Sequence, residues 1–106
     1  MMTYTLIDGV KRNADHPDRF YIPSEVEKDA LEVGVVCKVG VEFKSAAWAT
    51  GERFWVRVTA RDGEDFRGVI LNQLIWTDAH GLDDGEEIAF QRQHVIDIDF
   101  AEAATQ

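Results

Sequence analysis

Apolar and polar residues alternate between Gly51 and Asn72, and this pattern predicts a β-hairpin. In its first half every second side chain is apolar, as in a strand with one buried and one solvated face: Phe54, Val56, Val58 and Ala60. Asp62-Gly63 follows, a dipeptide typical of tight turns because glycine accepts a positive φ. A second strand is then predicted from Phe66 to Leu71.

The register of this hairpin decides which side chains of the second strand are buried, since a slip of one residue exchanges the two faces. A three-residue loop, Arg61-Asp62-Gly63, sets one row of the second strand against the buried row of the first: Phe66, Gly68 and Ile70 opposite Val58, Val56 and Phe54. A two-residue loop, Gly63-Glu64, would instead turn Val69 and Leu71 toward that face. We expect the three-residue loop, because it joins the two bulkiest rows of side chains.

The same alternation predicts further strands on both sides of the hairpin. The longest covers Val35 to Phe43, with one row inward and the other outward: Val35, Cys37, Val39, Val41 and Phe43 against Val36, Lys38, Gly40 and Glu42. Two short strands follow the hairpin, Glu86–Phe90 with Ile88 and Phe90 inward, and Val95–Phe100 with Ile96, Ile98 and Phe100 inward. A weaker pattern marks a short strand at Tyr4–Ile7.

One short helix is predicted ahead of the longest strand. Ser24 and Glu27 fit a capping box, in which the serine hydroxyl accepts from the Glu27 amide while Glu27 reaches back. The helix should run to about Leu31 or Glu32 and end at Gly34, with a narrow apolar stripe: Val26, Ala30 and Leu31. The segment from Gly9 to Arg19 is polar and contains glycine, asparagine and proline, so we expect a loop there.

These elements predict one mainly β (α+β) domain over residues 1–106, with an irregular N-terminal segment (1–19), a helix plus β-barrel (20–100) and a tail (101–106). We expect a small SH3-like antiparallel barrel of about five strands with one short N-terminal helix. Such a barrel leaves few free strand edges and buries one face of the sheet with little chain. The tight connection Gln91–His94 between the last two strands suits this topology.

The net charge of −9 belongs entirely to the second part of the chain. Residues 1–61 contain nine acidic and nine basic side chains, whereas residues 62–106 contain eleven acidic side chains against Arg67 and Arg92. Such a charge distribution attracts basic partners and repels nucleic acid, so we expect no direct binding of DNA or RNA. The alternative is that the charge serves only solubility.

No catalytic or metal-binding motif is present in the sequence. The histidines lie in loops or connections and belong to no known catalytic motif: His16, His80 and His94. His80 and the nearby Asp78, Asp83 and Asp84 have the composition of metal ligands, but their spacing does not fit a calcium-binding loop. We therefore expect a non-enzymatic protein without a metal or another cofactor.

The single cysteine and the start of the chain bear on location. Cys37 lies in the inward row of a predicted strand, which predicts a buried, unreactive thiol. No apolar run is long enough to span a membrane, and the first residues lack the basic region and apolar stretch of a secretory signal. We expect a cytoplasmic protein that binds no membrane.

Several short stretches of the chain resemble the bacterial YegJ-like family, a domain of unknown function. The similar residues, within a match over roughly 20–98, are Glu52-Arg53-Phe54-Trp55-Val56-Arg57-Val58, Gly68-Val69-Ile70-Leu71-Asn72, Gly85-Glu86-Glu87-Ile88 and Ile96-Asp97. The chain departs from the family pattern at Gln73-Leu74, Glu86 and Ile98. The resemblance implies a small, mostly β, bacterial or phage-borne domain with no established activity.

The three tryptophans are the other candidates for binding. Trp55 is predicted on the outer face of the hairpin among Arg53, Arg57 and Arg67, and aromatic residues with arginine are typical of interface hot spots. Alternatively, Trp55 covers a second small core formed with the N-terminal helix. Trp48 and Trp76 lie in irregular chain, and we expect Trp76 to plug one end of the barrel.

We expect this protein to act by protein–protein interaction, as an inhibitor or immunity-type protein whose acidic face occupies a basic, nucleic-acid-binding surface of its partner. The candidate binding residues are Asp78, Asp83, Asp84, Glu86, Glu87, Asp97, Asp99, Trp55, Arg53 and Arg57. The alternatives are a housekeeping domain that binds a small ligand or metal, and a weak metal-dependent hydrolase. An exposed Trp55 face would also allow a homodimer.

Overall fold

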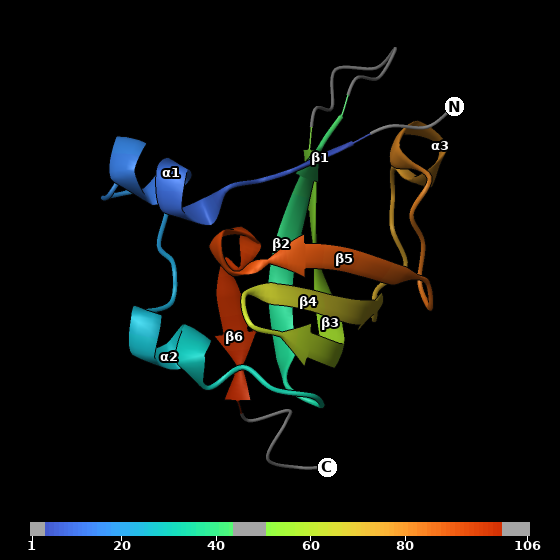
Figure 1. Cartoon of the computed structure of the whole chain (residues 1–106). Helices are drawn as coiled ribbons and strands as arrows, with labels where there is room; N and C mark the ends of the chain where they lie inside the picture. The colour runs from blue at the N-terminus through green and yellow to red at the C-terminus, as the bar shows by residue number, and fades with distance from the viewer. Residues whose placement is uncertain (1–3, 44–50, 101–106) are drawn as a thin grey trace.

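A computed structural model describes residues 4–43 and 51–100, and its centre is a strongly curled antiparallel sheet (Figure 1). The strands are β1 (Thr5–Leu6), β2 (Val36–Glu42), β3 (Gly51–Asp62), β4 (Asp65–Ile70), β5 (Glu87–Gln91) and β6 (Asp97–Asp99). The helical elements are α1 (Gly9–Asp15), α2 (Glu25–Asp29), α3 (Thr77–His80) and the 3₁₀ turn η1 (Arg92–His94). None of these helices has the length and apolar composition needed to cross a membrane.

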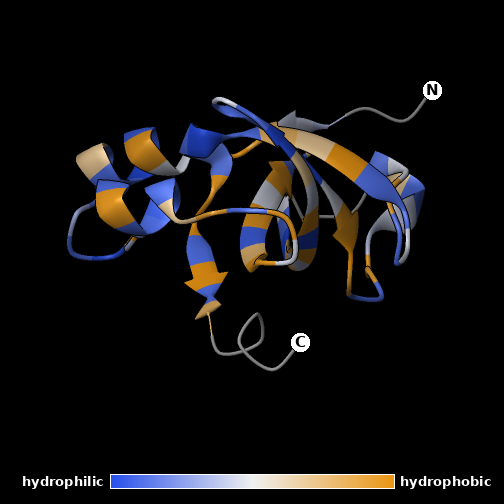
Figure 2. Cartoon of the chain, turned by 60° about the horizontal axis from the view of Figure 1, so that its bottom comes forward, coloured by the Kyte–Doolittle hydropathy of each residue, from blue (hydrophilic) through white to orange (hydrophobic). Residues whose placement is uncertain are grey.

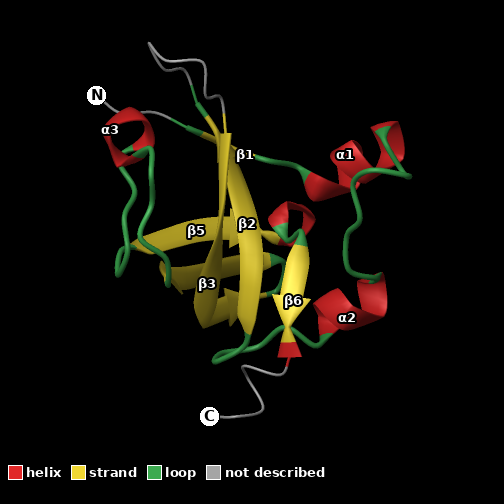
Figure 3. Cartoon of the chain, turned by 180° about the vertical axis from the view of Figure 1, so that it is seen from behind, coloured by secondary structure: helices red, strands yellow, loops and turns green. Residues whose placement is uncertain are grey.

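The order of the strands is that of a small SH3-like barrel, as the sequence predicts. Strands β1 to β5 pair in chain order, and β6 pairs back with β2. Seen from behind, β6 lies between β2 and α2 (Figure 3). No pairing joins β5 to β1 within the described residues, so the barrel is open between these two strands.

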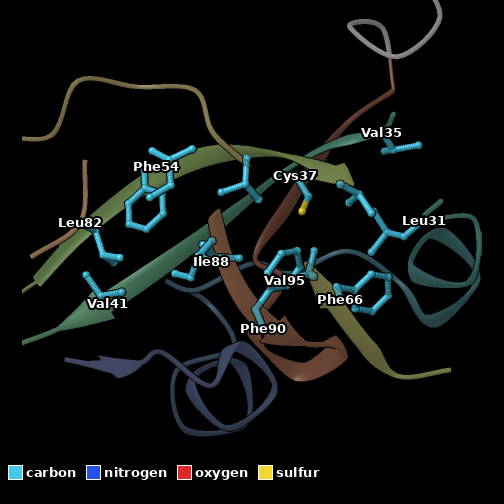
Figure 4. Packing of buried hydrophobic residues seen from close by; sticks show 14 of the residues in the cluster. Leu31, Val35, Cys37, Val41, Phe54, Phe66, Leu82, Ile88, Phe90 and Val95 are labelled. Atoms are coloured by element: carbon cyan, nitrogen blue, oxygen red, sulfur yellow. The ribbon is translucent and has the colours of Figure 1, made fainter. Parts of the chain in front are cut away.

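The inner face of the curled sheet carries the main hydrophobic core. Apolar and polar residues form alternating bands along the strands (Figure 2), and the apolar ones converge in the middle (Figure 4). The inward row predicted for β2 is buried throughout, from Val35 to Phe43. Phe66 of β4 stacks on Phe90 of β5, with ring centroids 5.5 Å apart.

The connection in the central hairpin differs from the three-residue loop that the sequence favours. Asp62 pairs with Asp65, so the loop is the two-residue Gly63-Glu64, and Gly63 has φ +63°. A β-bulge then shifts the pairing between Val58 and Ala60. The shorter loop alone would turn Val69 and Leu71 toward the buried face. The extra residue of β3 at the bulge shifts the pairing by one more position and so returns the other row of β4 to the buried face.

The bulge explains why the predicted buried row is correct although the predicted pairs are not. Phe66 and Ile70 are buried, but Gly68 lies opposite Val58 and Ile70 lies opposite Val56, a shift of one pair along the strand. Gly68 permits close packing there, because a Cβ at this position would lie 2.9 Å from the carbonyl oxygen of Arg57.

The N-terminal segment contains a helix where the sequence predicts a loop. Helix α1 begins after Asp8, whose carboxylate accepts from the amide of Lys11 at 3.0 Å, and it ends just before Pro17. Its first residue, Gly9, lies against a second apolar cluster formed by Ile7, Phe20, Ile96 and the partly buried Ile22. Ile7 of this cluster covers Gly40, which, like Val36, was predicted to face solvent but is buried.

Helix α2 has the predicted capping box but a different orientation and length. The hydroxyl of Ser24 accepts from the Glu27 amide at 3.2 Å, and Glu27 accepts from the Ser24 amide at 3.0 Å. The helix ends at Asp29, Val26 is 78% exposed, and Lys28 is fully buried. On the same helix Glu25 and Asp29 form ion pairs with Arg92 of η1, which connects α2 to the barrel.

The last strand is shorter than predicted, and its residues divide differently between the faces. Val95 is completely buried in the main core and Ile96 is buried in the second cluster, whereas Phe100 is 39% exposed rather than inward. The 3₁₀ turn η1 precedes them and breaks the simple alternation on which the prediction rested.

Candidate binding surface

The structure separates the predicted acidic residues into two groups (Figure 1). Five of them lie along α3 and the start of β5, and we call them the acidic rim: Asp78, Asp83, Asp84, Glu86 and Glu87. The other two, Asp97 and Asp99, lie on β6, which begins beyond η1 at the opposite end of β5. The seven carboxylates therefore do not form one continuous face.

Most carboxylates of the acidic rim are free to meet a partner. Asp78, Asp84 and Glu86 are exposed, and no ion pair holds them within the described residues. The Asp83 carboxylate accepts from the Asp84 amide at 2.8 Å. Glu87 forms an exposed ion pair with Arg67 at 2.9 Å, a type of contact that contributes little to stability.

The backbone of the rim is fixed by turns and by bonds to β4. Gly81 and Gly85 have φ of +82° and +84°, which glycine adopts without the penalty other residues meet. The amide of Gly85 donates to the Ile70 carbonyl at 2.8 Å, and the Ile70 amide donates to the Glu86 carbonyl at 2.9 Å. Thr77 closes the loop by donating its hydroxyl to the Leu82 carbonyl.

A buried histidine–glutamate pair anchors this segment to β3. His80 is 2% exposed, and its Nε2 lies 2.9 Å from Oε1 of Glu52. The two carboxylate oxygens of Glu52 also accept from the amides of Ile75, at 2.7 Å, and Trp76, at 3.0 Å. Phe43 packs against the edge of the His80 ring.

The hydrogen bonds define the protonation of this pair. Nδ1 of His80 accepts from the Leu82 amide at 3.0 Å, so the ring proton lies on Nε2 and points at Glu52. Burial raises the pKa of Glu52, but the bonds from His80, Ile75 and Trp76 outweigh burial, and the net shift is downward. Glu52 is therefore a carboxylate that receives three donors.

The sequence gives no signal for this anchor. His80 was considered with Asp78, Asp83 and Asp84 as a set of potential metal ligands, but its ring turns inward, away from these side chains, to bond Glu52. Glu52 precedes it by 28 residues, and only the curl of the sheet brings the two together. Among the described residues no group of three or more histidine, cysteine or acidic side chains is arranged to hold a metal ion.

The predicted Trp55 face is largely occupied by contacts within the protein. The ammonium group of Lys38 lies over the Trp55 ring, 4.7 Å from its centroid. Arg53 stacks on Phe20, and Arg57 donates to the Gly34 carbonyl at 3.0 Å. These residues thus connect the sheet to the second apolar cluster and to the segment after α2.

The predictions for the other two tryptophans, Trp76 and Trp48, have different outcomes. Trp76 is partly buried against the main core, 6.3 Å from the Phe43 ring, and so plugs an end of the barrel as predicted. Trp48 lies outside the described residues.

Cys37 is expected not to react with thiol reagents in the folded protein. It is completely buried on β2, and burial raises the pKa of its thiol to about 12, so almost no thiolate exists at pH 8. Ellman's reagent should show no reaction at pH 8 until denaturant is added, and one equivalent of thiol afterwards. Rapid reaction without denaturant would contradict the buried position.

One groove lies away from the rim loops, where the β3–β4 hairpin ends beside β5. It encloses about 500 Å³ and contains both apolar and charged side chains, among them Leu6, Arg61, Arg67, Ala89, Phe90 and His94. A smaller groove of about 260 Å³ between α2 and β6 includes Asp97 and Glu27. A third groove, of about 290 Å³, includes Arg12, Glu42 and Arg53. The structure therefore offers concave surfaces besides the charged rim.

No protein-family model, curated protein or solved structure matches this chain. The resemblance to the YegJ-like family stays a prediction.

Proposed function

We propose that this protein is a non-enzymatic binding module that docks the acidic rim on a basic surface of another protein. The supporting observation is the arrangement of the rim. Four of its five carboxylates are exposed, and three of them make no ion pair or side-chain hydrogen bond with any described residue. Its backbone is fixed by β4 and by the buried Glu52–His80 pair. A fixed array of negative charges gives fast, salt-sensitive association with a complementary surface.

Rigid carboxylates of this kind can take the place of phosphates on a protein that normally binds nucleic acid. The partner would then be inhibited, because the acidic rim and the nucleic acid compete for the same lysine and arginine side chains. An inhibitor or immunity-type protein acts in this way.

The placement of the histidines favours binding over acid–base catalysis. His80 is buried against Glu52, and Nδ1 of His94 accepts from the Gln91 amide at 2.9 Å. Burial lowers the pKa of His94, an effect that Asp8 opposes, so its net shift is toward the neutral ring. Both rings therefore serve the local backbone structure.

Reversing two rim charges is expected to weaken binding of the partner by about tenfold or more at low salt. Asp84 and Glu86 suit this test, because both are exposed and neither side chain makes a hydrogen bond or ion pair within the described residues. A partner captured from the host at low salt is purified, and Kd is measured at about 50 and 300 mM salt, a range over which screening increases strongly. Asp84→Lys with Glu86→Lys should also flatten the salt dependence.

Asp15→Lys with Asp18→Lys is the matched control, because it changes the net charge equally at exposed residues near the end of α1. The control should keep the wild-type Kd, and nucleic acid should displace the wild-type protein from the partner. Equal weakening by both double variants would mean that only net charge counts, and the rim would then not be the binding site.

A further inference from the structure

Strand β5 presents an unpaired edge. It pairs with β4 alone among the described residues (Figure 1). The Ile70 amide donates to the Glu86 carbonyl, and the Arg92 amide donates to the Glu64 carbonyl. In an antiparallel ladder alternate residues face the partner strand, so the N–H and C=O groups of Glu87, Ala89 and Gln91 point to the open side.

The N–H of Gln91 already has an acceptor, and no hydrogen bond to the other outward groups is made by the residues that the structure describes. The Gln91 amide donates to Nδ1 of His94 at 2.9 Å, which closes this end of the edge. Glu87 and Ala89 keep their outward backbone groups, and β5 has no proline, no bulge and no inward-pointing charge. Natural proteins usually block an edge strand with such devices.

The groove of about 500 Å³ adjoins the second half of this edge, from Ala89 to Gln91, and continues over the end of the β3–β4 hairpin. Leu6 of β1 lines it together with Ala89 and Phe90 of β5, so the groove occupies the opening of the barrel. The stacked Phe66 and Phe90 rings lie beneath it. The side chains of an added strand would alternate between this apolar surface and solvent.

The charges at the two ends of β5 select the occupant. Four carboxylates flank the strand: Glu86 and Glu87 at its start, and Asp65 and Asp62 at its end. They outnumber the two arginines of the groove, Arg67, which pairs with Glu87, and Arg61, which donates to the Leu31 carbonyl. An extended segment with lysine or arginine at alternate positions would therefore meet net negative charge. A second copy of β5 would instead bring acidic side chains together.

We propose that β5 binds an extended, basic segment of the partner as an added β-strand, whose apolar side chains enter the groove between β5 and β1. This mode of recognition uses backbone hydrogen bonds for affinity and side-chain pockets for selectivity. The proposal rests on the proposed function and adds the conformation and composition of the segment that is bound.

The test uses a peptide of alternating lysine and valine, about eight residues long, which is enough to cover a typical strand. Binding is followed by NMR with ¹⁵N-labelled protein. We expect cross-strand contacts from the peptide backbone to the amides of Glu87 and Ala89, and slower hydrogen exchange at both. A glutamate–valine peptide of the same length should not bind.

Ala89→Pro removes the outward N–H and should weaken peptide binding by about tenfold or more, the cost of a lost hydrogen-bond pair and a steric block. Proline is tolerated on an edge strand where its nitrogen faces solvent, and the variant should keep its fold. If the variant does not fold, the cross-strand NMR contacts and the hydrogen-exchange rates of the wild-type protein decide whether the peptide adds to β5 as a strand.

The outcomes separate the two proposals. One outcome is that Asp84→Lys with Glu86→Lys weakens binding of both the peptide and the partner while Ala89→Pro weakens neither. The acidic rim is then the binding site, and the proposed strand addition is wrong. If neither variant changes binding of the partner, both proposals are wrong. Broadened β5 signals and a doubled mass without peptide would show that a second copy occupies the edge, which would overturn the assignment to a basic segment.

Discussion

Glu52→Ala is expected to lower the free energy of unfolding by about 2–5 kcal/mol, because each buried donor left without an acceptor costs about 1–3 kcal/mol. The truncation leaves Nε2–H of His80 and the amides of Ile75 and Trp76 without their common acceptor. Urea unfolding measures the loss. Hydrogen exchange should also become faster from Ile75 to Leu82, because the anchor that fixes the acidic rim is gone.

Glu42→Ala is the matched control for this substitution. Glu42 forms an exposed ion pair with Arg12 at 2.9 Å, so its removal should cost no more than about 1 kcal/mol. If both variants lost equal stability, the buried anchor would have no special importance.

Glu52 also makes the protein sensitive to acid. Its pKa in the folded protein is lowered below the ordinary value of 4.5. The unfolded chain therefore binds a proton more readily, and the stabilisation is fully present above about pH 4.5 and is lost as the pH falls through the folded pKa. This part of the acid dependence should be absent from Glu52→Ala.

Lys28→Met is expected to raise the free energy of unfolding at pH 7 by about 1–3 kcal/mol, the penalty for a buried polar group without a partner. Lys28 is completely buried, and its Nζ has no hydrogen-bond partner among the described residues. Methionine has a similar unbranched shape and fills the same space without the charge. Lys11→Met, at an exposed position of α1, should change stability by less than about 0.5 kcal/mol.

The pH dependence identifies the cause of this gain. Burial lowers the pKa of Lys28, and nearby Arg92 adds to this effect, while Glu25 and Asp8 oppose it. The penalty is present in full below the folded pKa and is relieved as the pH rises from that value toward the ordinary 10.5. The advantage of Lys28→Met should therefore shrink in alkaline solution. An advantage that stayed constant up to pH 10.5 would point to packing alone.

The local alternation of apolar and polar residues was sufficient to predict the strands of the barrel. The inward rows of β2 and β5, and that of β3 as far as Val58, follow from period-2 alternation, because one face of each strand is buried in a single core. Ala60, predicted in the buried row of β3, lies beyond the bulge and is exposed. The capping box at Ser24 was also readable, since all its atoms lie within four residues. The tight connection that became η1 indicated how the last strand returns to β2.

Other features depend on residues that meet only in the folded chain. The bulge in β3 compensates for the shorter hairpin loop, and the sequence predicts neither feature unless the other is known. Helix α1 begins at Gly9 against the second apolar cluster, which draws on Ile7, Phe20 and Ile96 from three parts of the chain. Lys28 is buried on α2, whose exposed carboxylates Glu25 and Asp29 pair with Arg92, 64 residues after Lys28.

The sequence by itself determined that the chain forms a small antiparallel barrel with its negative charge in the second half, since both are sums over local residues. Only the tertiary structure decided where that charge lies. It divides the carboxylates between the rim and β6, turns His80 inward to Glu52, and leaves the edge of β5 open. These are distances between residues far apart in sequence, and only the path of the folded chain sets them.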